Sequence, residues 1–148
     1  TRFWDANRKP LRVHENILIF SPRAAIYHPQ MAQGKPHKRG KESPDRPEGV
    51  YSRSPRYSTG IHDTYYPRSV IEFSAEAKPT HPTQKPVPLY AWLIETYSDP
   101  GATILDPCCG SGTTGVAALQ TGRTFIGIDI REDYLATART RLEEAANG

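Results

Sequence analysis

Apolar and polar residues form two kinds of pattern in the last third of the chain. The short apolar runs at 103–106 (TILD) and 124–129 (TFIGID) have the length of strands, and the second is as apolar as a central parallel strand should be. Residues 113–120 and 131–145 follow these runs and show helical spacing. The order strand, helix, strand, helix predicts one βαβα unit, and therefore an α/β fold with a parallel sheet.

A further helix is predicted directly upstream of this unit. Pro86 and Pro88 favour a helix start. The large apolar residues that follow recur at i, i+3, i+4 and i+8, namely Leu89, Trp92, Leu93 and Tyr97. We expect this stripe to face the core.

The first 79 residues show weaker patterns. HENILIF (14–20) is predicted to form a buried strand, and SVIEF (69–73) a short strand. Residues 23–67 have no period and are dominated by Gly, Pro, Ser, Lys and Arg, with tyrosines interspersed. So long a stretch without regular elements is usually either functional or disordered.

Charge divides the chain in a similar way. Residues 1–79 contain 14 Lys and Arg against 8 Asp and Glu, whereas residues 80–148 contain 5 against 8. A basic irregular part beside a mildly acidic regular part predicts a surface for an anionic partner next to a small-molecule fold. The alternative is a solvated basic segment without a partner.

The remaining composition bears on the cellular location, the membrane partners and the metal sites that we expect. The chain contains no apolar run of membrane-spanning length, and its first residues do not resemble a signal peptide. The two cysteines, Cys108 and Cys109, are adjacent, so they are poor disulfide partners and match no zinc-site spacing. A cytoplasmic protein with no membrane partner and no metal site is expected.

A glycine-rich turn joins the first strand of the βαβα unit to its helix. Residues 110–115 (GSGTTG) match G-x-G-x-x-G, and Asp129 lies 17 residues after Gly112, near the spacing of an acidic residue that binds ribose hydroxyls. This context predicts a nucleoside-containing ligand. The turn contains no Gly-Lys-Ser/Thr, so it is not a P-loop.

Asp106, at the end of the first strand, bears on which nucleoside is bound. A carboxylate is a poor neighbour for a pyrophosphate and a good one for an ammonium group, and adenosine joined to an α-amino acid describes S-adenosylmethionine. Two alternatives stay open. The G-x-G-x-x-G pattern is also typical of an NAD(P)-binding oxidoreductase fragment, and Asp106 could simply accept hydrogen bonds from local backbone N–H groups.

Four stretches resemble the N6-adenine/N4-cytosine DNA methyltransferases. ILDPCCGSGTTGVAA (104–118) resembles that family's cofactor motif, HPTQKPVPLYAWLIETYSDPGATILDP (81–107) the segment before it, and PLRVHENILIFSP (10–22) with YHPQMAQGKP (27–36) its middle region. The order is that of members with the catalytic region first and the cofactor region last. The resemblance implies a partial Rossmann-like methyltransferase sheet with an irregular basic insertion. The expected parts are a catalytic-half strand (1–22), a target-recognition segment (23–79) and an S-adenosylmethionine-binding unit (80–148).

The resemblance also implies roles for individual residues. Asp106 and the glycine turn would surround the methionine moiety, Asp129 would bind the ribose, and Ile130 would pack near the adenine. Thr83 and Lys85 would hold the amino-acid end of the cofactor. Cys108 stands where the family usually has phenylalanine. The expected cofactor residues are Thr83, Lys85, Asp106, Pro107, Cys108, Gly110, Ser111, Gly112, Thr113, Asp129 and Ile130.

The implied reaction is methyl transfer from S-adenosylmethionine to the N6 amine of adenine in duplex DNA, or to the N4 amine of cytosine. In this family an Asp/Asn/Ser-Pro-Pro-aromatic loop prepares the flipped base, and the 148 residues contain no such loop. We therefore expect the C-terminal portion of a methyltransferase, inactive by itself; a non-catalytic DNA-binding remnant is the alternative.

Double-stranded DNA is the expected partner, and a homodimer is compatible with the sequence. The basic residues expected to contact DNA are Arg23, Lys35, Lys38, Arg39, Lys41, Arg53 and Arg56.

Overall fold

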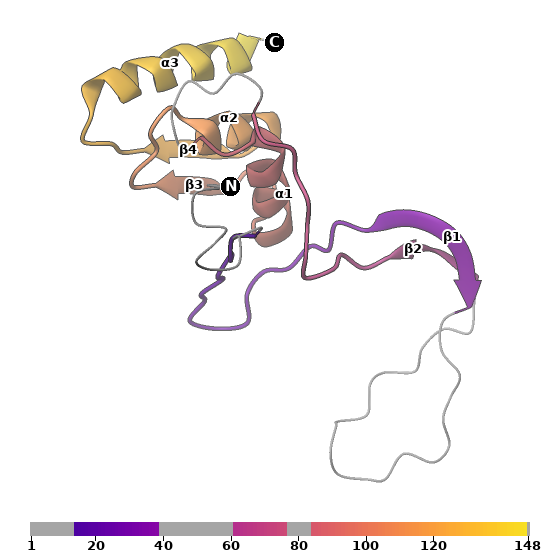
Figure 1. The fold of residues 1–148 in the computed structure, drawn as a ribbon. Coiled ribbons are helices and arrows are strands. Elements are labelled where there is room, and N and C mark those ends of the chain that lie inside the picture. The colour runs from indigo at the N-terminus through magenta and orange to yellow at the C-terminus, as the bar shows by residue number, and fades with distance from the viewer. Residues whose placement is uncertain (1–13, 39–60, 77–83, 148) are drawn as a thin grey trace, which may run out of the picture.

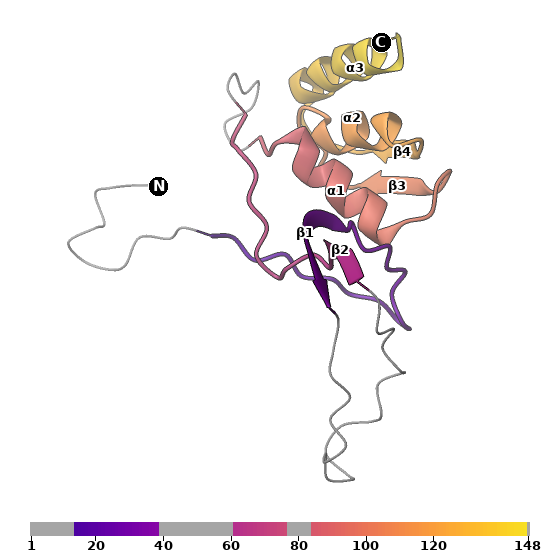
Figure 2. The same ribbon diagram turned by 90° about the vertical axis from the view of Figure 1, so that its right-hand side faces the viewer.

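The computed structural model describes residues 14–38, 61–76 and 84–147 (Figure 1). Within these ranges a two-stranded ribbon precedes an α/β unit, and α1 lies between the ribbon and α3 in both views (Figures 1 and 2). In chain order the elements are β1 (Ala32–Lys38), β2 (Ile61–Tyr65), α1 (Val87–Tyr97), β3 (Thr103–Asp106), α2 (Thr113–Gln120), β4 (Thr124–Gly127) and α3 (Glu132–Asn147).

The predicted βαβα unit is confirmed. β3 and β4 pair in parallel, with Thr103 opposite Thr124 and Asp106 opposite Gly127, and α2 is the crossover between them. β4 ends at Gly127 rather than at Asp129. The N–H of the next residue, Ile128, donates to the carbonyl oxygen of Asp106 at the end of β3, and the carbonyl oxygen of Ile128 accepts from the N–H of Cys109. Since both strands run the same way, the residues that follow them meet at one edge of the sheet.

The core lies where α1 crosses α2. Ile94 of α1 is buried against the small side chains of Ala117 and Ala118 in α2. Ile104 of β3 and Phe125 of β4 pack against the same cluster. This core is small, because alanines on α2 allow α1 to approach closely and leave little volume for larger side chains.

The predicted helix at α1 is confirmed, but the prediction of its core-facing stripe is wrong. The residues that pack on the core are Val87, Tyr90, Ala91 and Ile94, at i, i+3, i+4 and i+7. The predicted stripe is only half-buried: Leu89, Trp92, Leu93 and Tyr97. Two of these residues, Leu93 and Tyr97, line an open apolar hollow of about 350 Å³ together with Ile17 to Ile19 and Ile104.

The helix α3 packs over the glycine-rich side of α2. Ala138 is buried, and a Cβ atom added to Gly115 of α2 would lie 2.6 Å from the ring of Phe125 and 2.7 Å from Leu142. Only glycine at this position lets β4 and α3 approach α2 from its two sides. The helix predicted at 131–145 is confirmed, and the apolar residues that give it helical spacing, which include Ala138 and Leu142, lie on its buried side.

Two strand predictions are wrong. Residues 14–20 and 69–73 form no strand, and Leu18 and Phe20 are 70% and 86% exposed. An apolar run becomes a strand only when a neighbouring strand accepts and donates its backbone hydrogen bonds. Within the described residues, neither run is paired with a strand.

The described part of the aperiodic stretch forms a β-ribbon that the sequence did not predict. β1 and β2 are antiparallel, and the register shifts between Gln33 and His37. Tyr65 holds the ribbon together: its hydroxyl donates to the carbonyl oxygen of Lys35 (2.9 Å), and its ring stacks on His37 with 4.2 Å between centroids. Gly34 leaves room for that ring, since a Cβ atom there would overlap it.

No helix in the described ranges is long and apolar enough to cross a membrane.

Candidate ligand site at the end of the parallel strands

The glycine turn between β3 and α2 has a conformation that side chains disfavour. Gly110 has φ +51° and Gly112 has φ +77°, both in the left-handed region. The N–H of Gly112 donates to the carbonyl oxygen of Cys109 (2.8 Å), and α2 begins at the next residue. A Cβ atom on Gly112 would also lie 2.8 Å from the Cβ of Ala138 in α3. Glycine is therefore required here both by the backbone and by the neighbouring helix.

Asp106 is fixed at the mouth of this turn. Its Oδ1 accepts a hydrogen bond from the N–H of Cys108 (3.1 Å), and its Oδ2 accepts one from the Thr114 hydroxyl (2.6 Å). The sequence suggested that Asp106 accepts hydrogen bonds from local backbone N–H groups, and the bond from Cys108 is of this kind. Each carboxylate oxygen can accept a second hydrogen bond, so the half-buried group is oriented and retains capacity for a ligand.

Asp129 approaches the same turn from the end of β4. Its Oδ2 accepts from the N–H of Gly110 (2.7 Å), and its Oδ1 accepts from the N–H of Arg131 (2.9 Å). Two carboxylates, one after each parallel strand, therefore hold the two sides of one glycine turn. Such a pair makes this edge of the sheet electronegative and suits a ligand with ammonium or hydroxyl donors.

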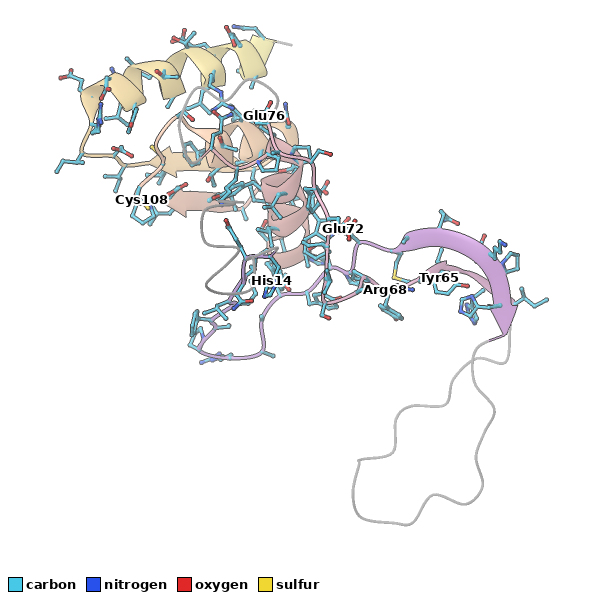
Figure 3. The ribbon with its side chains drawn as sticks, viewed as in Figure 1. His14, Tyr65, Arg68, Glu72, Glu76 and Cys108 are labelled. Carbon is cyan, nitrogen blue, oxygen red and sulfur yellow. The ribbon has the colours of Figure 1, made fainter. Side chains whose placement is uncertain are left out.

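The two cysteines of the turn have different environments. Cys108 is exposed beside the tip of β3 (Figure 3). Cys109 is buried, and its burial raises the pKa of its thiol; the negative charges of Asp106 and Asp129 raise the pKa further. The Cys109 thiol therefore stays neutral near pH 7 and adds no third negative charge to the turn.

The predicted rim residues lie around the turn. Pro107 is exposed, and Ile130 is 99% exposed, with its side chain in solvent after β4. The guanidinium of the next residue, Arg131, lies 4.2 Å from the centroid of the Tyr134 ring and pairs with Asp133. This ion pair lowers the pKa of Asp133, chiefly through its hydrogen bond with Arg131.

Lys85 lies in the segment that leads into α1. Its ammonium group donates to Glu15 Oε2 (2.6 Å) in a solvent-accessible ion pair, so the structure connects it to the N-terminal segment. Thr83, its predicted companion, lies outside the described residues.

Arg141 of α3 is a site residue that sequence reasoning missed. Its Nη1 donates to the Ser111 carbonyl oxygen (2.6 Å), the Ser111 hydroxyl (3.1 Å) and the Thr113 hydroxyl (3.2 Å). The side chains of Ser111 and Thr113, both predicted at the ligand, are buried and hold the turn to α3. Nothing in the sequence distinguishes Arg141 from Arg139, which is exposed on the same helix.

Tyr90 of α1 is a second missed residue. It is half-buried on the face of α1 that packs on α2, and burial, followed by the nearby charge of Asp106, raises the pKa of its phenol. Sequence reasoning missed it because an aromatic residue at helical spacing is more often a core residue than a site residue, and a hydroxyl adds no periodic signal to the sequence.

The predicted DNA-contact residues divide into described and undescribed ones. Arg23 is exposed before the ribbon, Lys35 is exposed in β1, and Lys38 is the last residue of β1. The others lie outside the described residues: Arg39, Lys41, Arg53 and Arg56.

Comparison with known proteins places the chain in a family. The DNA methylase model N6_N4_Mtase matches residues 2–140. The chain belongs to this DNA methylase family. Among its relatives, type II methyltransferase M2.DpnII of Streptococcus pneumoniae is 56% identical over 63 residues, which are 43% of this chain and 24% of that protein. DNA adenine methyltransferase YhdJ of Escherichia coli (strain K12) is 40% identical over 82 residues, 55% of this chain and 27% of that protein.

A solved structure is similar to part of this chain. The crystal structure of the M1.HpyAVI-SAM complex is 31% identical to it, with a TM-score of 0.43, over 59% of this chain and 52% of that one. Matches to the curated relatives named above cover about a quarter of each relative's length. Membership confirms the predicted family, and the described α/β unit is a partial Rossmann-like methyltransferase fold.

Proposed function

We propose that this DNA methylase chain forms the S-adenosylmethionine-binding part of an enzyme that methylates the N6 amine of adenine in duplex DNA. The N4 amine of cytosine is the second candidate substrate. The observation that carries the proposal is the pair of oriented carboxylates, Asp106 and Asp129, on one glycine turn at the end of two parallel strands. One relative is named a DNA adenine methyltransferase, which favours adenine. Family membership sets aside the NAD(P)-dependent oxidoreductase.

The two carboxylates match the two ends of the cofactor. Asp106, half-buried and fixed by its hydrogen bonds to the turn, would accept the ammonium group. Asp129 would accept the ribose hydroxyls, and the exposed side chain of Ile130 would cover one face of the adenine. Lys85, with Thr83, would hold the carboxylate end. Pro107, Cys108 and the Gly110–Thr113 backbone would line the space between.

The bound cofactor supplies a methyl group on a positively charged sulfur. The exocyclic amine that receives it is a poor nucleophile, because its lone pair is delocalised into the base. In this family a Pro-Pro-aromatic loop prepares the flipped base, and the 148 residues lack that loop. We therefore expect this chain alone to bind cofactor without transferring its methyl group.

Calorimetric titration of the chain with S-adenosylhomocysteine and with NAD tests the proposal. Saturable binding of S-adenosylhomocysteine is expected, because its ammonium and ribose groups meet Asp106 and Asp129. No binding of NAD is expected, because its pyrophosphate would meet the Asp106 carboxylate. Binding of NAD without binding of S-adenosylhomocysteine would contradict the proposal.

We further propose that residues 23–68 contact the DNA through the β1–β2 ribbon. A two-stranded ribbon fits the major groove of B-DNA, and this one extends away from the α/β unit (Figure 1) with Lys35 and Lys38 on one strand. Arg23 and the predicted basic residues Arg39, Lys41, Arg53 and Arg56 belong to the same segment. The proposed homodimer and the cytoplasmic location stay predictions.

The substitution Lys35→Glu tests the ribbon. Loss of one phosphate contact is expected to weaken DNA binding about five- to tenfold near 0.1 M salt, and to reduce the slope of log affinity against log salt by about one. Arg139→Glu on α3 changes the net charge by the same amount and is the matched control, with a smaller effect expected. DNA affinity is measured by fluorescence anisotropy over a salt series. Equal losses of affinity in both variants would show that Lys35 does not contact the DNA.

A further inference from the structure

Arg141 of α3 binds oxygen atoms of the glycine turn. Its Nη1 lies within hydrogen-bond distance of the Ser111 carbonyl oxygen (2.6 Å), the Ser111 hydroxyl (3.1 Å) and the Thr113 hydroxyl (3.2 Å). Ser111 and Thr113 are only 4% and 7% exposed, so little water reaches these oxygens to replace the guanidinium as a donor. The turn therefore depends on Arg141 for these hydrogen bonds.

The bond to the carbonyl oxygen fixes the orientation of one peptide group. The Ser111 carbonyl belongs to the same peptide group as the N–H of Gly112, which donates to the carbonyl oxygen of Cys109 (2.8 Å). Arg141 and Cys109 thus hold the two ends of this peptide group. Glycine permits several backbone conformations at little steric cost. Arg141 therefore stabilises one conformation of a turn that its glycines alone would not fix.

The helix end beside Arg141 gives no electrostatic reason for a cation. Thr113 is the first residue of α2, and the N-terminus of a helix carries a partial positive charge that favours anions over cations. The macrodipole of α2 therefore opposes a guanidinium at this place. What Arg141 contributes here is the set of hydrogen bonds to the turn.

We infer that Arg141 is a positioning residue for the adenosyl cofactor, acting through the Ser111–Gly112 peptide group. The inference rests on the proposed function of the site. Asp106 and Asp129 bind donors of the turn, the N–H groups of Cys108 and Gly110, whereas Arg141 binds its acceptors. Without the guanidinium, the turn is held through its donors only, and the two carboxylates are less strictly placed relative to each other. Loss of Arg141 should then weaken ligand binding beyond any loss of stability.

Removal and replacement of the guanidinium test this role. Arg141→Ala is expected to weaken S-adenosylhomocysteine binding in calorimetry about ten- to thirtyfold, as the loss of hydrogen bonds to a charged group predicts. Millimolar ethylguanidinium should restore most of the affinity, because the position is only half-buried and the ion can enter from solvent. Sodium chloride at the same concentration should not. Guanidinium ions destabilise folded proteins in general, so a purely structural role would give no such recovery.

Arg123→Ala is the matched control. Arg123 is 8% exposed, and its guanidinium donates to the carbonyl oxygens of Thr121 and Ser98. It precedes β4, whose first residue lies opposite the first residue of β3, so it lies at the other end of the parallel strands from the two carboxylates. Its replacement should lower the free energy of unfolding in urea and leave S-adenosylhomocysteine affinity within about twofold, since distant sites act independently.

A second variant keeps the test valid if Arg141→Ala does not fold. Arg141→Lys retains the charge but lacks the planar group of donors, and a smaller loss of affinity is expected from it. Both variants are compared with the control at a temperature at which urea unfolding shows each to be folded.

The outcomes separate the inference from the proposed function. A loss of affinity in Arg141→Ala that ethylguanidinium reverses, or, where only Arg141→Lys folds, a loss greater than that of Arg123→Ala, supports the inference. A loss no greater than that of Arg123→Ala, or one that ethylguanidinium does not reverse, overturns it and leaves the proposed function standing. If the unsubstituted chain does not bind S-adenosylhomocysteine, the proposed function is overturned and the inference with it.

Discussion

Replacing Asp106 with alanine is expected to weaken S-adenosylhomocysteine binding about 100-fold. A hydrogen bond to a charged group contributes about 1.5–3 kcal/mol, and about 1.4 kcal/mol corresponds to a factor of ten in affinity. Alanine removes the acceptor for the ligand's ammonium group. It also leaves the Cys108 N–H and the Thr114 hydroxyl without the acceptor they now share, so the turn loses its fixed shape.

Asp106→Asn separates charge from shape. The amide keeps the size and one acceptor oxygen and removes the negative charge, so a loss of about tenfold is expected. Asp133→Asn is the control: Asp133 is an exposed carboxylate on α3 whose hydrogen-bond partner is Arg131, and its replacement should not change affinity. Calorimetry measures all three variants. Wild-type affinity in Asp106→Asn would show that charge at this position does not select the ligand.

Gly112→Ala is expected to destabilise the fold by about 3 kcal/mol. A non-glycine residue in the left-handed region costs about 1–2 kcal/mol, and overpacking adds about 1–3 kcal/mol. Overpacking follows here because the new methyl group would lie 2.8 Å from the Cβ of Ala138 and 3.1 Å from its Cα. The helix α3 would have to move, and with it the Arg141 hydrogen bonds to the turn.

Gly122→Ala isolates the packing contribution. Gly122 has φ +73°, close to the φ of Gly112, and a Cβ atom there would have no neighbour within 4 Å. Its replacement should therefore cost only the backbone strain, about 1 kcal/mol. Urea denaturation measures both free energies of unfolding. Equal destabilisation by the two substitutions would show that α3 does not pack against the turn as described.

The parts of the fold that the sequence predicted are those that local chemistry determines. The apolar strand ending at Asp106, the glycines of the turn and the small-residue helix α2 each follow from residues close together in the chain. The family motif likewise lies on one short stretch around Gly112. Local pattern and family resemblance therefore agreed on the parallel βαβα unit.

The missed features depend on contacts between distant residues. The prediction of the core face of α1 was wrong because the alanines of α2, rather than the size of the α1 side chains, decide which α1 residues pack on the core. The ribbon was missed because Tyr65 and Lys35, thirty residues apart, stabilise it with a bond that gives no period. Arg141 was missed because its partner, Ser111, lies on another element.

The predicted strand at residues 14–20 failed for a related reason. Its composition suits a strand, but a strand also needs a neighbour for its backbone groups. In the described ranges no strand pairs with it, and Ile17 to Ile19 instead line the open hollow together with residues of α1 and Ile104 of β3.

A crystal structure of the chain with S-adenosylhomocysteine tests the central claim most directly. The ammonium group is expected in contact with the Asp106 carboxylate and the ribose hydroxyls in contact with Asp129, with the glycine turn between them. A ligand whose adenine or ribose occupies the Asp106 side, or which binds away from this edge of the sheet, would contradict it.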